Sequence, residues 1–85
     1  MELINLGGGN YVNASRLVAV VSPDSLPVRR LVQDAKNAGR VIDVSGSKKT
    51  RSVLITDSEH IICCAVETAA LQEQIEAEQT EEGKE

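Results

Sequence analysis

The chain has 85 residues, enough for one small domain, and carries a formal net charge of −4 at pH 7. Tyr11 is the only aromatic residue, so the core must consist of Val, Ile, Leu and Ala and must be thin. Domains of about this size commonly need disulfides, metal ions or self-association for stability. Two cysteines and one histidine are too few for a zinc set, and no metal or other cofactor is predicted. Self-association is therefore the physical expectation.

The charge is unevenly distributed. Residues 1–70 hold eight Lys and Arg against seven Asp and Glu, a net +1, whereas residues 71–85 hold six Glu and one Lys, a net −5. An acidic block that is separate from a basic patch does not exclude a nucleic-acid partner. We therefore treat residues 1–70 as the folded domain and residues 71–85 as the end of a C-terminal helix with an acidic tail, disordered from about Glu76.

The first residues, the length of the apolar runs and the cysteines indicate where in the cell the protein is expected. Residues 1–6 lack a basic start and a long apolar segment, so no signal peptide is expected, and no apolar run is long enough for a membrane span. Cys63 and Cys64 are adjacent in an apolar run, where neighbouring side chains point to opposite faces of a strand. Reduced thiols in a cytoplasmic protein without a membrane partner are predicted.

The hydrophobic pattern predicts strands separated by turns, with one helix in the middle and another at the end. In chain order we expect a strand at 3–6, a glycine turn at 7–10, the start of a strand at 11–12, a strand at 17–21, a helix from a cap at Asp24 or Ser25 to Gly39, strands at 41–44, 52–56 and 61–66, and a helix from Thr68. This is an α+β class, with a small antiparallel sheet of about five to six short strands, a central amphipathic helix and a C-terminal helix.

Gly46 to Arg51 forms the most distinctive loop, because Lys48, Lys49 and Arg51 place three cations within four residues between two predicted strands. Such a loop either binds a polyanion, through charge neutralisation and counterion release, or only keeps the turn solvated. We expect it to close one antiparallel hairpin and the turn at 57–59 to close the next.

Other candidate sites are weaker. The glycine turn at 7–10 is not followed by the Gly-Lys-Ser/Thr of a phosphate loop. Arg16, directly before an apolar strand, is either a surface or interface cation or an ordinary flanking charge. His60, Asp57 and Glu59 lie in or beside a polar turn and match no nucleophile, acid–base or metal arrangement, so no enzyme and no small-molecule substrate are predicted.

The order of these segments resembles the RemA family of bacterial extracellular-matrix regulators over residues 3 to 67. The matching residues are Leu3–Gly7, Gly9-Asn10, Ala14, Arg16, Val21–Ser25, Pro27, Arg30, Gln33–Ala35, Gly39, Ile42-Asp43, Thr50-Arg51 and Asp57–Ile62.

The resemblance implies a transcriptional regulator that binds double-stranded DNA and controls biofilm-matrix genes or, in some bacteria, osmotic-stress genes. It also implies a subunit like LytTR DNA-binding domains, assembled into a homo-oligomeric ring of about seven or eight copies around which DNA bends. By position, the family's DNA-binding residues fall on Lys48, Lys49, Arg51 and Arg16. Whether Arg16 contacts DNA or a neighbouring subunit is left open by the sequence.

This sequence departs from the family pattern at two places that affect the expected DNA contact. Lys48 and Lys49 stand where the family commonly has paired arginines, and lysine keeps phosphate contact better than it keeps bidentate base contacts. Gly46-Ser47 also replaces the aromatic–glycine pair often seen before the loop in the family, and Gly8 stands where an aromatic residue is usual. The alternative function is a structural or protein-interaction module whose basic loop binds an acidic protein partner.

Overall fold

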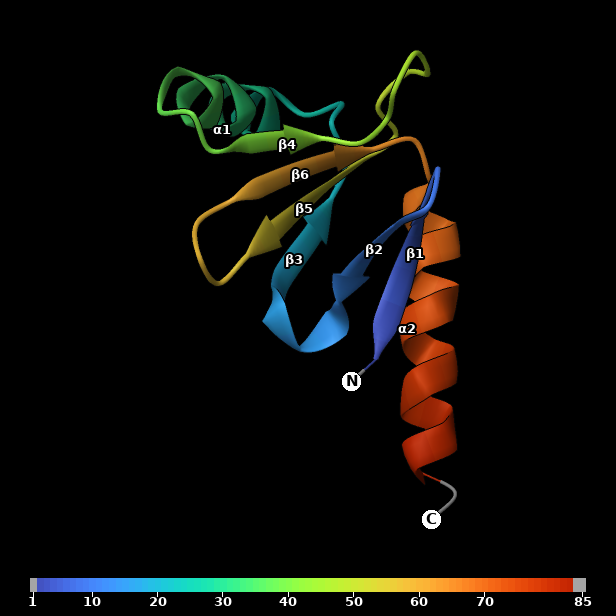
Figure 1. Ribbon diagram of the computed structural model, residues 1–85. Coiled ribbons are helices and arrows are strands. Elements are labelled where there is room, and N and C mark those ends of the chain that lie inside the picture. Colours follow the sequence, from blue (N-terminus) through green and yellow to red (C-terminus); the bar gives the residue numbers. More distant parts are fainter. Residues whose placement is uncertain (1, 84–85) are drawn as a thin grey trace.

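The computed structural model describes residues 2–83, which Figure 1 colours in chain order. Over these residues the chain forms β1 (Leu3–Gly7), β2 (Asn10–Asn13), the 3-10 turn η1 (Ala14–Arg16), β3 (Leu17–Val21), α1 (Leu26–Asn37), β4 (Val41–Asp43), β5 (Ser52–Thr56), β6 (Ile61–Cys64) and α2 (Thr68–Gly83). The predicted α+β class, with a central and a C-terminal helix, is confirmed.

The strands form two sheets, whereas the sequence pattern predicted one. β1 and β2 make an antiparallel hairpin, and the other four strands make a sheet in the order β3-β5-β6-β4. The turn at residues 57–59 joins β5 and β6 as an antiparallel hairpin, as predicted. The prediction that residues 46–51 also close a hairpin is wrong, because β4 pairs in parallel with β6.

The position of β6 explains this difference. Its residues Ile61–Cys64 are buried on both faces of the sheet, and such a strand is most stable with a neighbour at each edge. β6 therefore lies between β5 and β4 and separates the two strands that follow each other in sequence. The loop at residues 44–51 crosses the end of β6, and the sheet is mixed.

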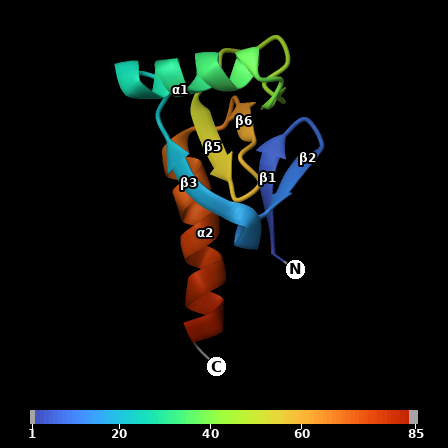
Figure 2. The same cartoon turned by 90° about the vertical axis from the view of Figure 1, so that its left-hand side faces the viewer.

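Structural layers cover both faces of the four-stranded sheet (Figures 1 and 2). α1 lies on one face, and the β1–β2 hairpin and α2 lie on the other. Alternate residues of β5 and β6 enter two separate apolar clusters. The α2-side cluster contains Ile4, Leu6, Leu54, Ile62, Cys64 and Leu71, and the α1-side cluster contains Val53, Ile61 and Cys63 with Val28, Val32 and Ala35 of the helix.

α1 begins and ends where the sequence predicts. Ser25 caps it, its Oγ accepting a hydrogen bond from the Val28 N–H at 3.3 Å, and Pro27 lies in the first turn, where a missing N–H costs least. Gly39 follows the helix with φ +71°, a conformation that favours glycine.

Cys63 and Cys64 are free thiols, as predicted, and are buried on opposite faces of the sheet. Burial raises the pKa of both thiols above the ordinary value, with the Asp43 carboxylate adding to the effect at Cys63. Both side chains therefore act as small apolar residues of the core.

α2 packs on the hairpin through Leu71, which is fully buried, and through Gln74. The Gln74 side chain accepts a hydrogen bond from the Asn5 N–H at 2.9 Å and donates one to the Asn5 carbonyl at 3.1 Å. The predicted tail at 71–85 includes residues 84–85, which lie outside the described residues, and its disorder stays a prediction. Within residues 2–83, neither helix has the length and apolar character needed to cross a membrane.

Candidate nucleic-acid interface

The basic loop, residues 44–51, is fixed at its base by polar contacts. The Oδ1 atom of Asp43 accepts hydrogen bonds from the N–H of Ser45, at 2.9 Å, and from the Ser45 hydroxyl. The Ser45 hydroxyl also lies 3.4 Å from the Thr50 hydroxyl across the loop. These bonds from Ser45 are the main cause of a lowered Asp43 pKa, and Lys36 contributes a smaller effect.

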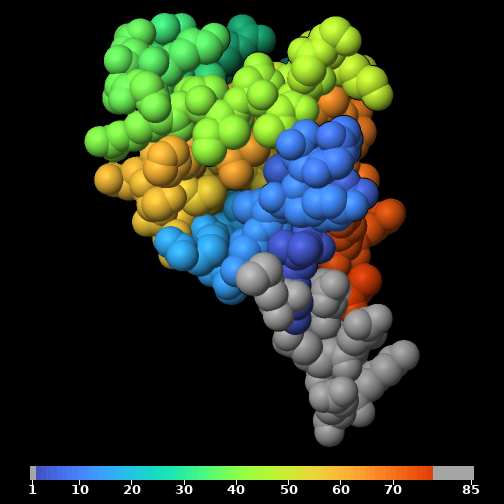
Figure 3. Space-filling model, viewed as in Figure 1, coloured from blue at the N-terminus to red at the C-terminus, as the bar shows by residue number. Residues whose placement is uncertain are grey.

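The tip of the loop is a tight turn. Gly46 has φ +65°, and the Lys48 N–H donates a hydrogen bond to the Ser45 carbonyl at 3.1 Å. The side chains of Lys48 and Lys49 are exposed, and neither takes part in the ion pairs found among the described residues. Figure 3 shows this part of the chain, in yellow-green, projecting beside the blue β1–β2 hairpin. The loop thus offers two solvated cations on a backbone fixed at its base.

Arg51 occupies the base of the same loop. Its backbone N–H donates a hydrogen bond to the Cys64 carbonyl at 2.8 Å, which anchors the residue beside β6. Its Nη1 lies 3.4 Å from Glu67 Oε1, an ion pair in which both side chains are more than half exposed. Exposed pairs of this kind are worth about 0–1 kcal/mol, so a phosphate oxygen can replace the carboxylate at low cost.

A hollow of about 410 Å³ separates the basic loop from the glycine turn of the β1–β2 hairpin. Its lining includes Gly7, Gly8 and Asn10 from the hairpin and Ser45 to Lys48 from the loop, with Leu6, Val44, Ala65 and Val66 beneath. Among the described residues, no Asp or Glu side chain lines it. The lining residues carry amide, hydroxyl and ammonium groups, which are groups that can contact a phosphate oxygen.

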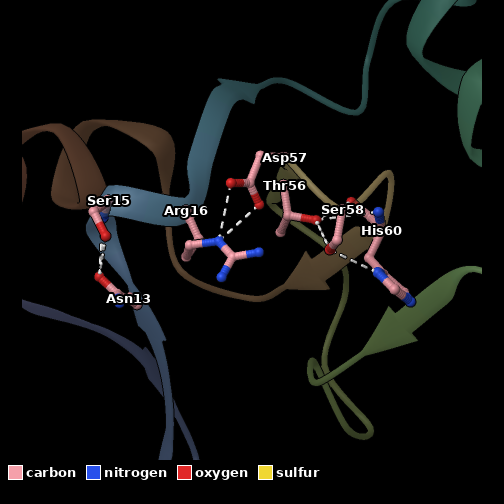
Figure 4. Close-up of polar contacts among 7 residues, drawn as sticks. All are labelled: Asn13, Ser15, Arg16, Thr56, Asp57, Ser58 and His60. Atoms are coloured by element: carbon pink, nitrogen blue, oxygen red, sulfur yellow. Dashed lines mark hydrogen bonds and ion pairs between the residues drawn. The ribbon is translucent and has the colours of Figure 1, made fainter.

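Arg16 lies apart from the loop. Its Nε donates to both Asp57 carboxylate oxygens, at 2.8 and 2.9 Å, and the Asp57 N–H donates to the Arg16 carbonyl at 2.9 Å (Figure 4). Asp57 follows the end of β5, whereas Arg51 precedes its start. A five-residue strand is about 16 Å long, so Arg16 and the basic loop lie at opposite ends of the sheet.

The structure thus brings Lys48, Lys49 and Arg51 together and places Arg16 elsewhere. Sequence reasoning missed the residues that support these cations: Asp43 and Ser45 at the loop base, Glu67 beside Arg51, and Asp57 beside Arg16. The Asp-x-Ser spacing at residues 43–45 is a local signal for such a polar turn. The ion-pair partners had no local signal, since both pairs join distant parts of the chain.

Side-chain hydrogen bonds and ion pairs connect the residues of the polar turn between β5 and β6. Ser58 Oγ lies 2.9 Å from His60 Nδ1, and Thr56 Oγ1 accepts the His60 N–H at 3.1 Å and lies 3.0 Å from Ser58 Oγ (Figure 4). The two carboxylates of this turn pair with arginines: Asp57 with Arg16, and Glu59 with Arg40 at 3.6 Å. These contacts stabilise the hairpin. Across residues 2–83 no three His, Cys, Asp or Glu side chains gather as a metal site.

Comparison with known proteins identifies the family. The family model described as extracellular matrix regulatory protein A-like matches residues 3–75. The chain belongs to the RemA-like family. The resemblance stated from residues 3 to 67 is confirmed.

Relatives of this RemA-like protein carry matching descriptions. A protein of Nitratidesulfovibrio vulgaris (strain DP4), named "Putative regulatory protein", is 54% identical over 70 residues, covering 82% of this chain and 81% of that protein. A Clostridium botulinum (strain Hall) protein, also named a putative regulatory protein, is 48% identical over an alignment of 89 positions that covers 100% of this chain and 98% of the relative. The family is one of regulatory proteins, not of enzymes.

Proposed function

We propose that this RemA-like protein is a cytoplasmic, DNA-binding transcriptional regulator that presents the loop of Lys48, Lys49 and Arg51 to the phosphate backbone of double-stranded DNA. The observation that carries the proposal is the exposed, carboxylate-free tip of a loop whose base is fixed by hydrogen bonds. Family membership supports a regulatory role, and the family description makes extracellular-matrix genes the first targets to examine. The resemblance stated from the sequence makes stress genes the next.

The DNA affinity expected from a single subunit is low, which favours an oligomer that repeats the loop. Each phosphate contact contributes a slope of about −0.9 to the dependence of log affinity on log salt concentration. Three contacts from one subunit therefore lose roughly 40-fold in affinity between about 50 and 200 mM salt, and the single contact surface is a weak binder. A homo-oligomer repeats the loop and gains affinity through effective concentration. A ring of about seven or eight subunits, implied by the family resemblance, is part of this proposal.

The loop favours affinity over base-specific recognition. Lysine is a flexible point charge and lacks the planar fork that arginine uses to contact guanine in the major groove. Phosphate contacts position a protein on DNA and carry no direct sequence information. We therefore expect sequence preference to come mainly from the bending and groove width of the DNA.

The experiment is a titration of labelled duplex DNA with the parent and with a Lys48→Ala, Lys49→Ala, Arg51→Ala variant, at several salt concentrations. The triple variant is expected to lose binding at moderate salt while its oligomer mass stays that of the parent, because these side chains lie outside the two apolar clusters.

A matched control compares Lys48→Ala, Lys49→Ala with Arg29→Ala, Arg30→Ala, which removes the same charge from the exposed surface of α1. Equal losses from the two double variants would mean that binding follows overall charge and not the loop. Parent-like DNA affinity of the triple variant would overturn the proposal. Capture of an acidic protein partner that persists after nuclease treatment, together with no shift of DNA at moderate salt, would instead favour the protein-interaction module.

A further inference from the structure

The four-stranded sheet has two open edges. β3 lies at one end and β4 at the other, and within residues 2–83 no strand pairs with the outer side of either. The five residues of β3 are all apolar, without the charged residue or proline that commonly protects an exposed edge. An unprotected apolar edge of this kind presents unpaired N–H and C=O groups to another strand.

The two edges run in the same direction. β3 is antiparallel to β5, β5 is antiparallel to β6, and β6 is parallel to β4. The β3 edge of one copy can therefore pair in parallel with the β4 edge of a second copy and continue the sheet. Such a contact is heterologous, since each copy uses two different surfaces, and it closes into a ring or extends into a filament.

Exposed apolar side chains lie on both edges. Val18, the extra residue where the β3–β5 register shifts, is 67% exposed, and Ile42 of β4 is 47% exposed. A hollow of about 600 Å³ lies between β3 and α2, lined in part by Leu17, Val20 and Ile75.

Ile42 faces the side of the sheet that holds this hollow, because it pairs with Ile62 of the α2-side cluster. A second copy whose β4 extends the sheet at β3 therefore brings its Ile42 to the hollow.

The charges at the edges are compatible with this contact. Arg16 precedes β3 and pairs with Asp57, and Arg40 precedes β4 and pairs with Glu59. Parallel pairing places these two arginine–carboxylate pairs side by side, where opposite charges can alternate across the contact. The basic loops lie at the other end of each β5, away from these four charges.

From these observations we infer that a second copy of this chain docks head to tail, with the outer edge of β3 in one subunit paired to the outer edge of β4 in the next. This contact specifies the surfaces of the homo-oligomer proposed above and forms without DNA. It places Arg16 at the subunit contact and leaves every basic loop exposed.

The test uses two substitutions at exposed positions, Val18→Lys and Ile42→Lys, with Tyr11→Lys as control. Tyr11 is 57% exposed on the outer side of β2, and its side chain belongs to neither apolar cluster. The masses are measured by native mass spectrometry and light scattering without DNA, and circular dichroism checks that each variant is folded. Each edge variant is expected to be a monomer of about the 9.1 kDa chain mass, and Tyr11→Lys to match the parent oligomer.

Mixing the two edge variants gives the decisive result. Val18→Lys keeps an intact β4 edge and Ile42→Lys keeps an intact β3 edge, so the mixture is expected to form a dimer with one of each and nothing larger. An Ile42→Lys variant that dimerises alone would indicate a symmetric β3–β3 contact and overturn the inference. A parent that stays monomeric at high concentration, or edge variants that assemble like the parent, would overturn it as well. All these outcomes are independent of DNA binding.

Discussion

At the residue scale, Glu67 is the acidic neighbour that most directly affects the proposed DNA contact. It lies 3.4 Å from Arg51 and competes with phosphate for the guanidinium. Glu67→Gln is therefore expected to raise DNA affinity, by up to about fivefold, the range set by an exposed ion pair. Glu73→Gln is the matched control, since it removes the same charge from an exposed residue of α2 that takes part in none of the ion pairs found among the described residues. Equal gains from both variants in a DNA titration would show a general charge effect and no local competition.

Asp43 gives a prediction on pH at the base of the loop. Its folded pKa is lowered by the hydrogen bonds from Ser45, so this carboxylate stabilises the fold at neutral pH and loses its contribution as pH falls through the folded pKa. Asp43→Asn is expected to be less stable than the parent at pH 7, with the difference narrowing in acid. Thermal melts from pH 7 to pH 3 measure it, with Asp24→Asn in the turn before α1 as control. A difference between parent and Asp43→Asn that is constant over this range would contradict the prediction.

The cations of the site were predictable because charge and turn residues can be read locally. Lys48, Lys49 and Arg51 follow a glycine between two apolar runs, and the structure places them on one loop. Their partners were not predictable, because Glu67 and Asp57 reach Arg51 and Arg16 only through the pairing of strands distant in sequence. Local patterns thus identify the groups that carry the charge, and tertiary structure decides which of them are partly neutralised.

At the element scale, the helix limits and the β5–β6 hairpin were predictable, and the neighbours of β4 were not. Ser25 and Gly39 are strong local signals for helix ends. Val41–Asp43 has no local signal for its partner, and a loop of eight residues fits a hairpin as well as a crossing connection. The usable signal was in Ile61–Cys64, a continuous apolar run typical of a central strand. Because β6 lies at the centre of the sheet, it separates β4 from β5.

The separation of Arg16 from the basic loop leads to a prediction about β3. If Arg16 belongs to the subunit contact, Arg16→Ala is expected to lower the oligomer mass at a given protein concentration, because Asp57 then lacks its partner at the start of the edge. DNA affinity should fall only as far as assembly falls. Sizing and DNA titration of the same samples measure both effects. An intact oligomer that has lost DNA affinity would instead make Arg16 a DNA contact.

At the scale of the whole molecule, the thin core and the open sheet edges have a common consequence. Only nine apolar residues are buried in the described part of the chain, and the edge strand β3 leaves apolar surface exposed. A small domain with so little core gains stability by covering such an edge. The same contact would arrange copies of the basic loop at regular spacing. Assembly and affinity for a polyanion are then coupled through geometry.

This coupling is measurable in the salt dependence of DNA binding. A subunit that contributes three phosphate contacts has an expected slope of about −2.7 in log affinity against log salt, and an oligomer that engages one duplex through several loops has a slope several times steeper. The monomeric Val18→Lys variant should therefore show the shallow slope and Tyr11→Lys the steep slope of the parent, although all three keep Lys48, Lys49 and Arg51. Because a lysine added at position 18 can only raise nonspecific attraction to DNA, a shallower slope in that variant is attributable to lost assembly. A parent slope as shallow as that of the monomer would mean that one subunit at a time contacts the duplex.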